Sequence, residues 1–253
     1  MDVIEKVERF YRKSKLEKFS IGKTHLGKDI YCFKVTKTQS PKLIIQYSIH
    51  AREYITSLLA LKQIKNFVKK GKRGQVYFLP LVNPDGVGIC LREKPLYKAN
   101  ANGVDLNVNF DAGWGKGEKN IFVKGDENFV GEYPFSEKES RALRDFTLRI
   151  RPNATVSYHS KGEEIYYQFH QDEKNEKRDL MLAEKIAKAT GYKIKSTPNS
   201  YGGYKDWCIK TLKIPSFTIE VGSDEYSHPL REKCLRKIYR KNKRVIEVLT
   251  ENL

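Results

Sequence analysis

The 253-residue sequence predicts an α/β fold in which residues 1–253 form a single domain. Two observations predict this class. Short apolar segments rich in β-branched and aromatic residues alternate along the chain with longer segments of helical periodicity. In addition, no internal repeat and no low-complexity linker divides the chain. We therefore expect a mixed, mostly parallel twisted sheet of about eight strands, with helices on both faces.

The first half of the chain alternates between the two kinds of segment. Val3, Ile4, Val7, Phe10 and Tyr11 are spaced as one apolar face of a charged helix. The next expected elements are strands over residues 28–35 and 42–49, a helix from 54 to about 70, a strand over 75–82, a turn at 83–86 and a long loop from about 94 to 132.

The second half continues the alternation. Ser136 followed by Glu139 predicts a capping box for a helix over residues 138–149. The remaining expected elements are a strand over 154–159, a helix over 178–191 closed by a glycine, a strand over 214–220 and a final amphipathic helix over 230–249.

The composition is strongly basic, with 48 lysine and arginine residues against 31 acidic residues and a formal net charge of +17. This balance favours a polyanionic neighbourhood such as nucleic acid, an anionic membrane or a bacterial wall polymer, or it reflects a lysine-rich composition with solvated faces. No nucleic-acid motif is present, so we expect no nucleic-acid partner. No stretch approaches the ~18 apolar residues of a membrane span. We expect a soluble monomer.

The N-terminus begins without an apolar signal segment, which predicts a cytoplasmic protein as the sequence stands. A cell-wall or extracellular location stays open, if the chain is a mature fragment or is released by lysis. The four cysteines are far apart and form no CxxC pair. Cys32 and Cys90 lie in apolar runs, so we interpret them as reduced core residues.

Polar residues of metal-binding type end three of the expected strands. His50 and Glu53 follow the second strand, His159 ends another, and Glu220 ends the last. Two imidazoles and one carboxylate suffice for a catalytic zinc site with a fourth position for water, and a spare carboxylate such as Glu220 can take a proton from that water. The sequence therefore predicts one zinc ion per chain.

Seven blocks extend this pattern through nearly the whole chain: HAREYIT, NPDG, GVDLNVNFDAGWG, YPFSEKESRAL, YHSKGEEIYY, YGGYKDW and FTIEVG. In this order they resemble the zinc carboxypeptidases of the carboxypeptidase A type. The resemblance implies a zinc metallopeptidase with His50, Glu53 and His159 as zinc ligands and Glu220 as general base.

The same resemblance implies roles for further residues. Asp105 matches the carboxylate that orients the first ligand histidine. Arg52 and Asn107 match substrate-binding residues, and Lys98 falls where the family places an arginine that polarises the scissile carbonyl.

Two departures from the family bear on the substrate. Val108 occupies the position of the arginine that pairs with Asn107 to bind a terminal carboxylate, and valine offers neither charge nor a hydrogen-bond donor. Pro198 occupies the position of the mobile active-site tyrosine, with Tyr201 nearby as a substitute.

Lys205 falls at the floor of the side-chain pocket, where a cation favours a substrate carboxylate; the alternative is a solvent-facing lysine paired with Asp206.

Within the family, the blocks KANANGVDLN, HSKGEEIYY and GGYKDW look most like bacterial γ-D-glutamyl-(L)-meso-diaminopimelate peptidases. We therefore expect hydrolysis of a peptidoglycan stem peptide or fragment at this bond. Three alternatives stay open: a metallocarboxypeptidase that releases acidic C-terminal residues, an amidohydrolase of the related acyl-amino-acid deacylase branch, and a non-catalytic wall-binding protein.

Overall fold

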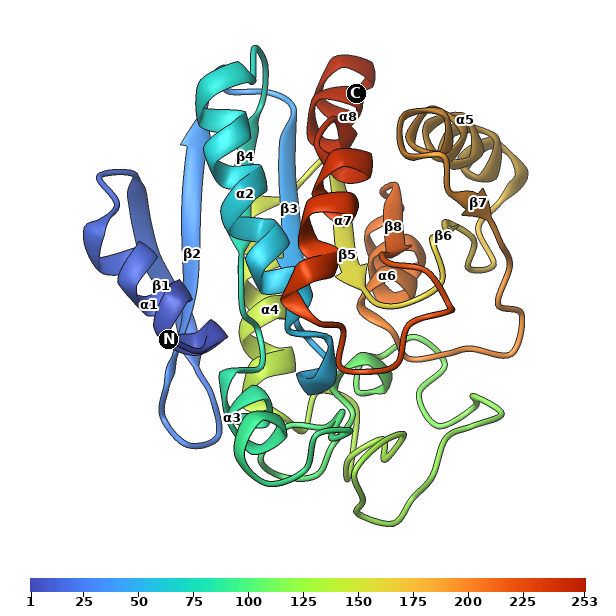
Figure 1. Cartoon of the computed structure of the whole chain (residues 1–253). Coiled ribbons are helices and arrows are strands. Elements are labelled where there is room, and N and C mark those ends of the chain that lie inside the picture. The colour runs from blue at the N-terminus through green and yellow to red at the C-terminus, as the bar shows by residue number, and fades with distance from the viewer.

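An eight-stranded sheet forms the centre of the computed structural model, which describes residues 1–253 (Figure 1). The strands lie in the order β1-β2-β4-β3-β5-β8-β6-β7. Their bounds are β1 Glu17–Lys23, β2 Asp29–Thr36, β3 Lys42–Tyr47, β4 Gln75–Leu79, β5 Ala154–His159, β6 Glu164–Tyr166, β7 Lys193–Ile194 and β8 Ser216–Glu220. β4, β3, β5 and β8 are parallel to one another in the middle, while β1, β2 and β6 introduce antiparallel pairs. The predicted mixed, mostly parallel sheet is confirmed.

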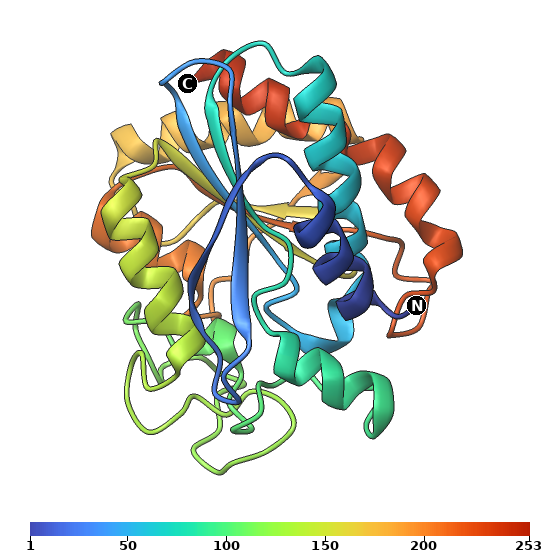
Figure 2. The same cartoon turned by 90° about the vertical axis from the view of Figure 1, so that its left-hand side faces the viewer.

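Helices cover both faces of this sheet. They are α1 Val3–Lys13, α2 Ile55–Lys70, α3 Pro84–Arg92, α4 Lys138–Ile150, α5 Glu173–Thr190, α6 Tyr204–Trp207, α7 Leu235–Asn242 and α8 Val245–Asn252. Figure 2 shows α4 on one side of the sheet and α1 and α2 on the other. In β3, Ile45 and Tyr47 belong to the core beneath α2, whereas Ile44 belongs to the core beneath α4. Burial on both faces explains why this strand reads as a continuous apolar run.

Three local predictions from the sequence are wrong. The expected turn at residues 83–86 is the start of α3, because the Asn83 side chain accepts a hydrogen bond from the Gly86 amide at 2.9 Å and caps the helix. The expected capping box is absent, because Glu137 is the N-cap of α4 and the Ser136 hydroxyl donates to its carboxylate. The final helix is divided into α7 and α8 at residues 243–244.

The chain between α3 and α4 is the expected long loop and contains only the short 3₁₀ turn Leu106–Val108. It lies at the carboxyl edge of the parallel strands, where Figure 1 shows it in green. All four cysteines are buried and unpaired, which agrees with reduced core thiols. None of the helices is both long enough and apolar enough to span a bilayer.

Gly202 and Gly191 test how tightly the loops at this edge pack. Both have positive φ, +82° and +74°, but a Cβ at Gly202 would lie 2.7 Å from the carbonyl oxygen of Val108, whereas a Cβ at Gly191 would meet nothing within 4 Å. We expect Gly191→Ala to lower the free energy of unfolding by about 1–2 kcal/mol through backbone strain. Gly202→Ala should cost about 1–3 kcal/mol more, because it also overpacks the loop. Urea unfolding measures both values, and equal losses would contradict the tight packing.

Candidate active site

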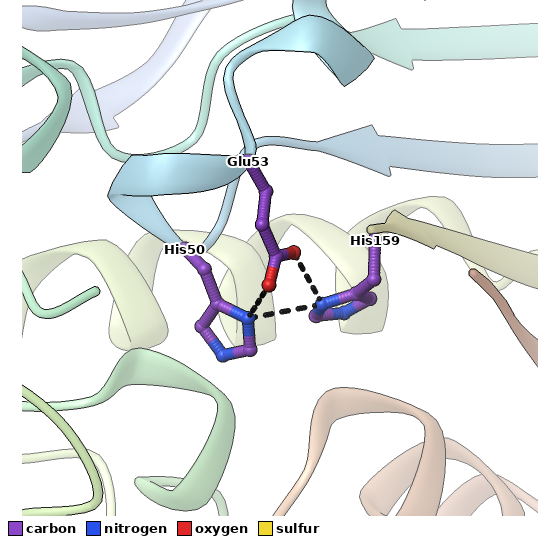
Figure 3. A group of neighbouring side chains, drawn as sticks. All are labelled: His50, Glu53 and His159. Carbon is purple, nitrogen blue, oxygen red and sulfur yellow. Dashed lines mark hydrogen bonds and ion pairs between the residues drawn. The ribbon is translucent and has the colours of Figure 1, made fainter. Parts of the chain in front are cut away.

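Two histidines and a glutamate from separate elements meet at the carboxyl edge of the sheet (Figure 3). His50 follows β3, Glu53 lies in the 3₁₀ turn Ala51–Glu53, and His159 is the last residue of β5. Because β3 and β5 are adjacent and parallel, their ends fall side by side. All three side chains are buried, and their ligand atoms lie within 4.8 Å of one another. The predicted convergence of His50, Glu53 and His159 is confirmed.

The three side chains point their ligand atoms at one small volume. The Glu53 carboxylate lies 2.9 Å from Nδ1 of His50 and 3.0 Å from Nδ1 of His159. The two Nδ1 atoms are 3.1 Å apart. Two ring nitrogens this close, both beside a carboxylate, form an electron-rich set that a cation would stabilise. Two imidazoles and one carboxylate are a donor set of catalytic zinc sites, so these residues fit zinc.

The charges within the cluster depend on one another. Burial would raise the pKa of Glu53, but the neighbouring imidazoles of His50 and His159 outweigh burial and hold that pKa well below its ordinary value. Burial alone would lower the pKa of His50, but the carboxylates of Glu53 and Asp105 outweigh burial and raise this pKa. The carboxylate of Glu53 is therefore ionised and available to bind a metal ion.

Asp105 connects the first histidine to a buried lysine. Its Oδ1 lies 3.1 Å from Nε2 of His50, and its Oδ2 lies 2.7 Å from Nζ of Lys98. An ionised carboxylate only accepts hydrogen bonds, so Nε2 of His50 carries a proton, and Nδ1 is the nitrogen that faces the cluster. Burial lowers the pKa of Lys98, but Asp105 outweighs burial and raises it, so Lys98 is cationic.

Glu220 is the last residue of β8 and lies beside His159 in the parallel register. Its Oε2 atom is buried and has no hydrogen-bond partner. Burial raises the pKa of Glu220 to about 8, although the His159 imidazole opposes this shift. An unpaired carboxylate with a raised pKa, next to a metal-ligand cluster, has the properties of a general base.

A cavity of about 450 Å³ opens beside the cluster. It is lined by His50, Lys98 and Asp105 and by the segments 117–120 and 197–201. Four further residues singled out from the sequence also line the cavity: Asn107, Val108, Pro198 and Tyr201. The side chains around it are mostly polar, which suits a hydrophilic substrate.

Two predicted substrate-binding residues do not line this cavity. Arg52 pairs with Glu127 at 2.9 Å and donates to the carbonyl oxygen of Leu96, so it holds the long loop. Lys205 is buried, pairs with Asp206 and donates to the carbonyl oxygen of Gln168 at 2.8 Å. Substrate contacts by Arg52 and Lys205 remain predictions.

Asn128 is a cavity residue that the sequence did not reveal. Its amide oxygen lies 3.4 Å from Nζ of Lys98, and its backbone N–H donates to Asp105 at 3.3 Å. Asn128 has φ +63°, a conformation that asparagine tolerates better than most residues. It lies in a loop without periodicity, so no sequence pattern indicated that it approaches the site.

Two buried histidines and a buried glutamate at the edge of an α/β sheet, next to an unpaired carboxylate, define a site of the zinc hydrolase class. Comparison with known families agrees with this class. The family model described as zinc carboxypeptidase matches residues 3–245, so the chain belongs to the zinc carboxypeptidase family.

Individual relatives include both endopeptidases and carboxypeptidases. The γ-D-glutamyl-L-diamino acid endopeptidase 1 of Lysinibacillus sphaericus is 28% identical over 229 residues, covering 76% of this chain and 57% of the relative. Carboxypeptidase B of Bos taurus is 29% identical over 244 residues, covering 81% and 58%. The chain thus spans less than two thirds of the length of both relatives. The solved structure of bovine thrombin-activatable fibrinolysis inhibitor with tick carboxypeptidase inhibitor superposes with a TM-score of 0.84 at 25% identity, covering 98% of this chain and 93% of that one.

Removal of one imidazole tests the metal cluster. His159→Ala should reduce the bound zinc from about one ion per chain to well below that value, because a carboxylate and a single imidazole bind zinc weakly. Elemental analysis after dialysis gives the zinc content. His25→Ala is the matched control, since His25 is exposed and distant from the cluster in sequence. Zinc content that is the same in both variants would exclude His159 as a ligand.

The raised pKa of Glu220 predicts a pH-dependent stability in metal-free protein. Above about pH 4.5 the unfolded chain ionises Glu220, whereas the folded chain ionises it only near pH 8. The free energy of unfolding therefore falls progressively as the pH rises from about 4.5 to about 8, because the unfolded chain releases this proton first. Glu220→Gln removes this cost, so the Tm of the variant minus the Tm of wild type should become larger as the pH rises from about 5 to about 8. Thermal unfolding in chelator measures this gap, and the exposed Glu225→Gln variant is the control. A gap that is constant with pH would contradict the assignment.

Proposed function

We propose that this protein is a metallopeptidase that hydrolyses the γ-D-glutamyl-diaminopimelate bond of peptidoglycan stem peptides or their fragments. The observation that carries the proposal is the position of Val108, which lines the cavity beside Asn107. No arginine lines this cavity, so no guanidinium is available there to form a bidentate pair with the terminal carboxylate of an ordinary peptide.

Two further observations support this substrate class. The Lysinibacillus sphaericus relative is named as an endopeptidase for γ-D-glutamyl-L-diamino acid bonds. The cavity also carries amide side chains at Asn107, Asn120, Asn128 and Asn199. Amides both donate and accept hydrogen bonds, which suits the densely polar stem peptide better than an apolar C-terminal side chain.

The residues of the site have separate roles in the proposed reaction. His50, Glu53 and His159 would hold zinc, which when bound supplies a Lewis acid that activates water. Glu220 accepts the proton of the attacking water and delivers it to the leaving amine. Lys98 stabilises the negative charge that develops on the scissile carbonyl oxygen, as a point charge held in place by Asp105.

A second candidate function is the release of acidic C-terminal residues. It is favoured by Lys119, which lines the cavity and has no carboxylate partner within 4.0 Å. A lysine on this loop could bind a carboxylate in place of the missing arginine. Lys205 pairs with Asp206 and does not line the cavity, so a contact between Lys205 and a substrate carboxylate remains a prediction.

Glu220→Gln tests the catalytic assignment. The variant should retain zinc, because Glu220 is outside the ligand cluster, and its kcat should fall by about 10²- to 10⁴-fold, the usual contribution of general-base catalysis. Glu225→Gln, five residues further along the chain, should behave as wild type. Turnover near the wild-type value in Glu220→Gln would mean that another group accepts the proton.

Digestion of defined peptides tests the substrate. The wild-type enzyme should cleave L-alanyl-γ-D-glutamyl-diaminopimelate between its second and third residues, and it should act poorly on peptides ending in Leu or Phe. Val108→Arg should lower the KM for the ordinary peptides, and Val108→Leu should not, because only arginine restores the bidentate pair. Mass analysis identifies the new termini. Efficient release of ordinary C-terminal residues without cleavage of the tripeptide would contradict the proposal.

A further inference from the structure

A strongly basic surface lies on the helical layer opposite α4. Residues 55–73, which include α2, contain six lysine and arginine residues and no acidic residue. Residues 231–244, which include α7, contain eight basic residues and one acidic residue, Glu232. Since α2 and α7 pack side by side (Figure 1), these two segments form one surface, here called the α2–α7 face.

The cations of this face are exposed and almost all unpaired. Thirteen of the fourteen are exposed; the half-buried one, Lys241, pairs with Glu163. None of the other thirteen has a carboxylate within 4.0 Å, and Glu232 is itself neutralised by Lys6 at 2.6 Å. The helix α5 is different, because its five basic residues are mixed with four acidic ones and two of them form ion pairs. The excess charge is therefore local and does not follow from the lysine-rich composition alone.

Contacts between the two helices fix the backbone positions that carry these charges. The Asn66 amide on α2 donates to the carbonyl oxygen of Lys243 at 3.1 Å and accepts from the Tyr239 hydroxyl at 3.2 Å. The ammonium of Lys62 lies 5.6 Å from the centre of the Tyr239 ring, across the helix interface. The cations within α2 lie between Lys62 and Lys70, which is about 12 Å of helix, so they occupy its C-terminal half.

We propose that the α2–α7 face binds a linear polyanion whose phosphate groups are joined through sugars or polyols. Among large apolar side chains, only Val68 is exposed on this face, which offers little for insertion into a bilayer. Tyr239 and Phe10, the aromatic rings that lie beneath the exposed cations Lys62 and Lys65, are only partly exposed. Single-stranded nucleic acid binders rely on exposed rings for base stacking, so this face recognises charge without bases.

The position of the face relates it to the catalytic edge. α2 begins two residues after Glu53, and α7 follows the loop that leaves Glu220. Both helices run from the catalytic edge toward the opposite edge of the sheet (Figure 1). A polymer bound along them would hold the enzyme beside substrates attached to the same network, and this binding does not depend on which bond the site cleaves.

Binding of a poly(glycerol phosphate) chain tests the proposal. The test variant replaces three exposed cations of α7, Arg236→Gln, Lys237→Gln and Arg240→Gln. The matched control makes the same change in charge on α5 with Lys174→Gln, Lys177→Gln and Lys188→Gln. At low salt the α7 variant should bind about 10- to 100-fold more weakly than wild type, and the slope of log Kd against log salt should fall by about 2. The α5 variant should bind as wild type.

Several results would overturn the proposal. Equal losses in the two variants would show a response to net charge, and binding without salt dependence would show that phosphate contacts are not involved. Tighter binding to oligo-deoxythymidine or to vesicles containing phosphatidylglycerol would assign the face to nucleic acid or lipid. Thermal unfolding verifies that both variants fold. Hydrolysis of the soluble tripeptide by the α7 variant should equal that of wild type, so failure of polymer binding and failure of the proposed peptidase activity are distinguishable.

Discussion

The site depends on a buried set of charges in which each carboxylate lies between two nitrogen groups. Glu53 lies between the imidazoles of His50 and His159, and Asp105 lies between His50 and Lys98. Burial of an unpaired ion costs several kcal/mol, so these groups tolerate burial only as a connected set. The set also fixes a proton on Nε2 of His50, and the opposite nitrogen, Nδ1, faces the cluster. Binding of a cation would complete the neutralisation of this set.

The sheet supplies the geometry for this arrangement. β3, β5 and β8 are adjacent and parallel, so His159 and Glu220, which end β5 and β8, lie at one edge of the sheet with His50, three residues beyond the end of β3. Tyr47 and Tyr158 of these strands stack in the core on the α2 face, with ring centroids 5.0 Å apart. The apolar core thus positions the strand ends, and the long loop contributes Asp105 and Lys98 above them.

The sequence allowed the fold class, the metal cluster and part of the cavity to be predicted. Strand ends of a parallel sheet meet by topology alone, which is why His50, His159 and Glu220 could be placed together. The strands β6 and β7, of three and two residues, are too short to produce a periodic pattern. The partner of Arg52 and the burial of the Lys205–Asp206 pair also could not be predicted. Glu127 is distant in sequence from Arg52, and burial of Lys205 with Asp206 is a result of tertiary packing.

Zinc K-edge X-ray absorption spectroscopy of the zinc-loaded protein tests the central claim most directly, because it measures the atoms around the metal. The arrangement of His50, Glu53 and His159 predicts two imidazole nitrogens at about 2.0–2.1 Å and carboxylate or water oxygens at about 2.0–2.2 Å. In His159→Ala the imidazole scattering should fall to that of a single ring, and in Glu220→Gln the spectrum should be unchanged. Sulfur at about 2.3 Å, or imidazole scattering that is the same in His159→Ala, would contradict the proposed metal centre.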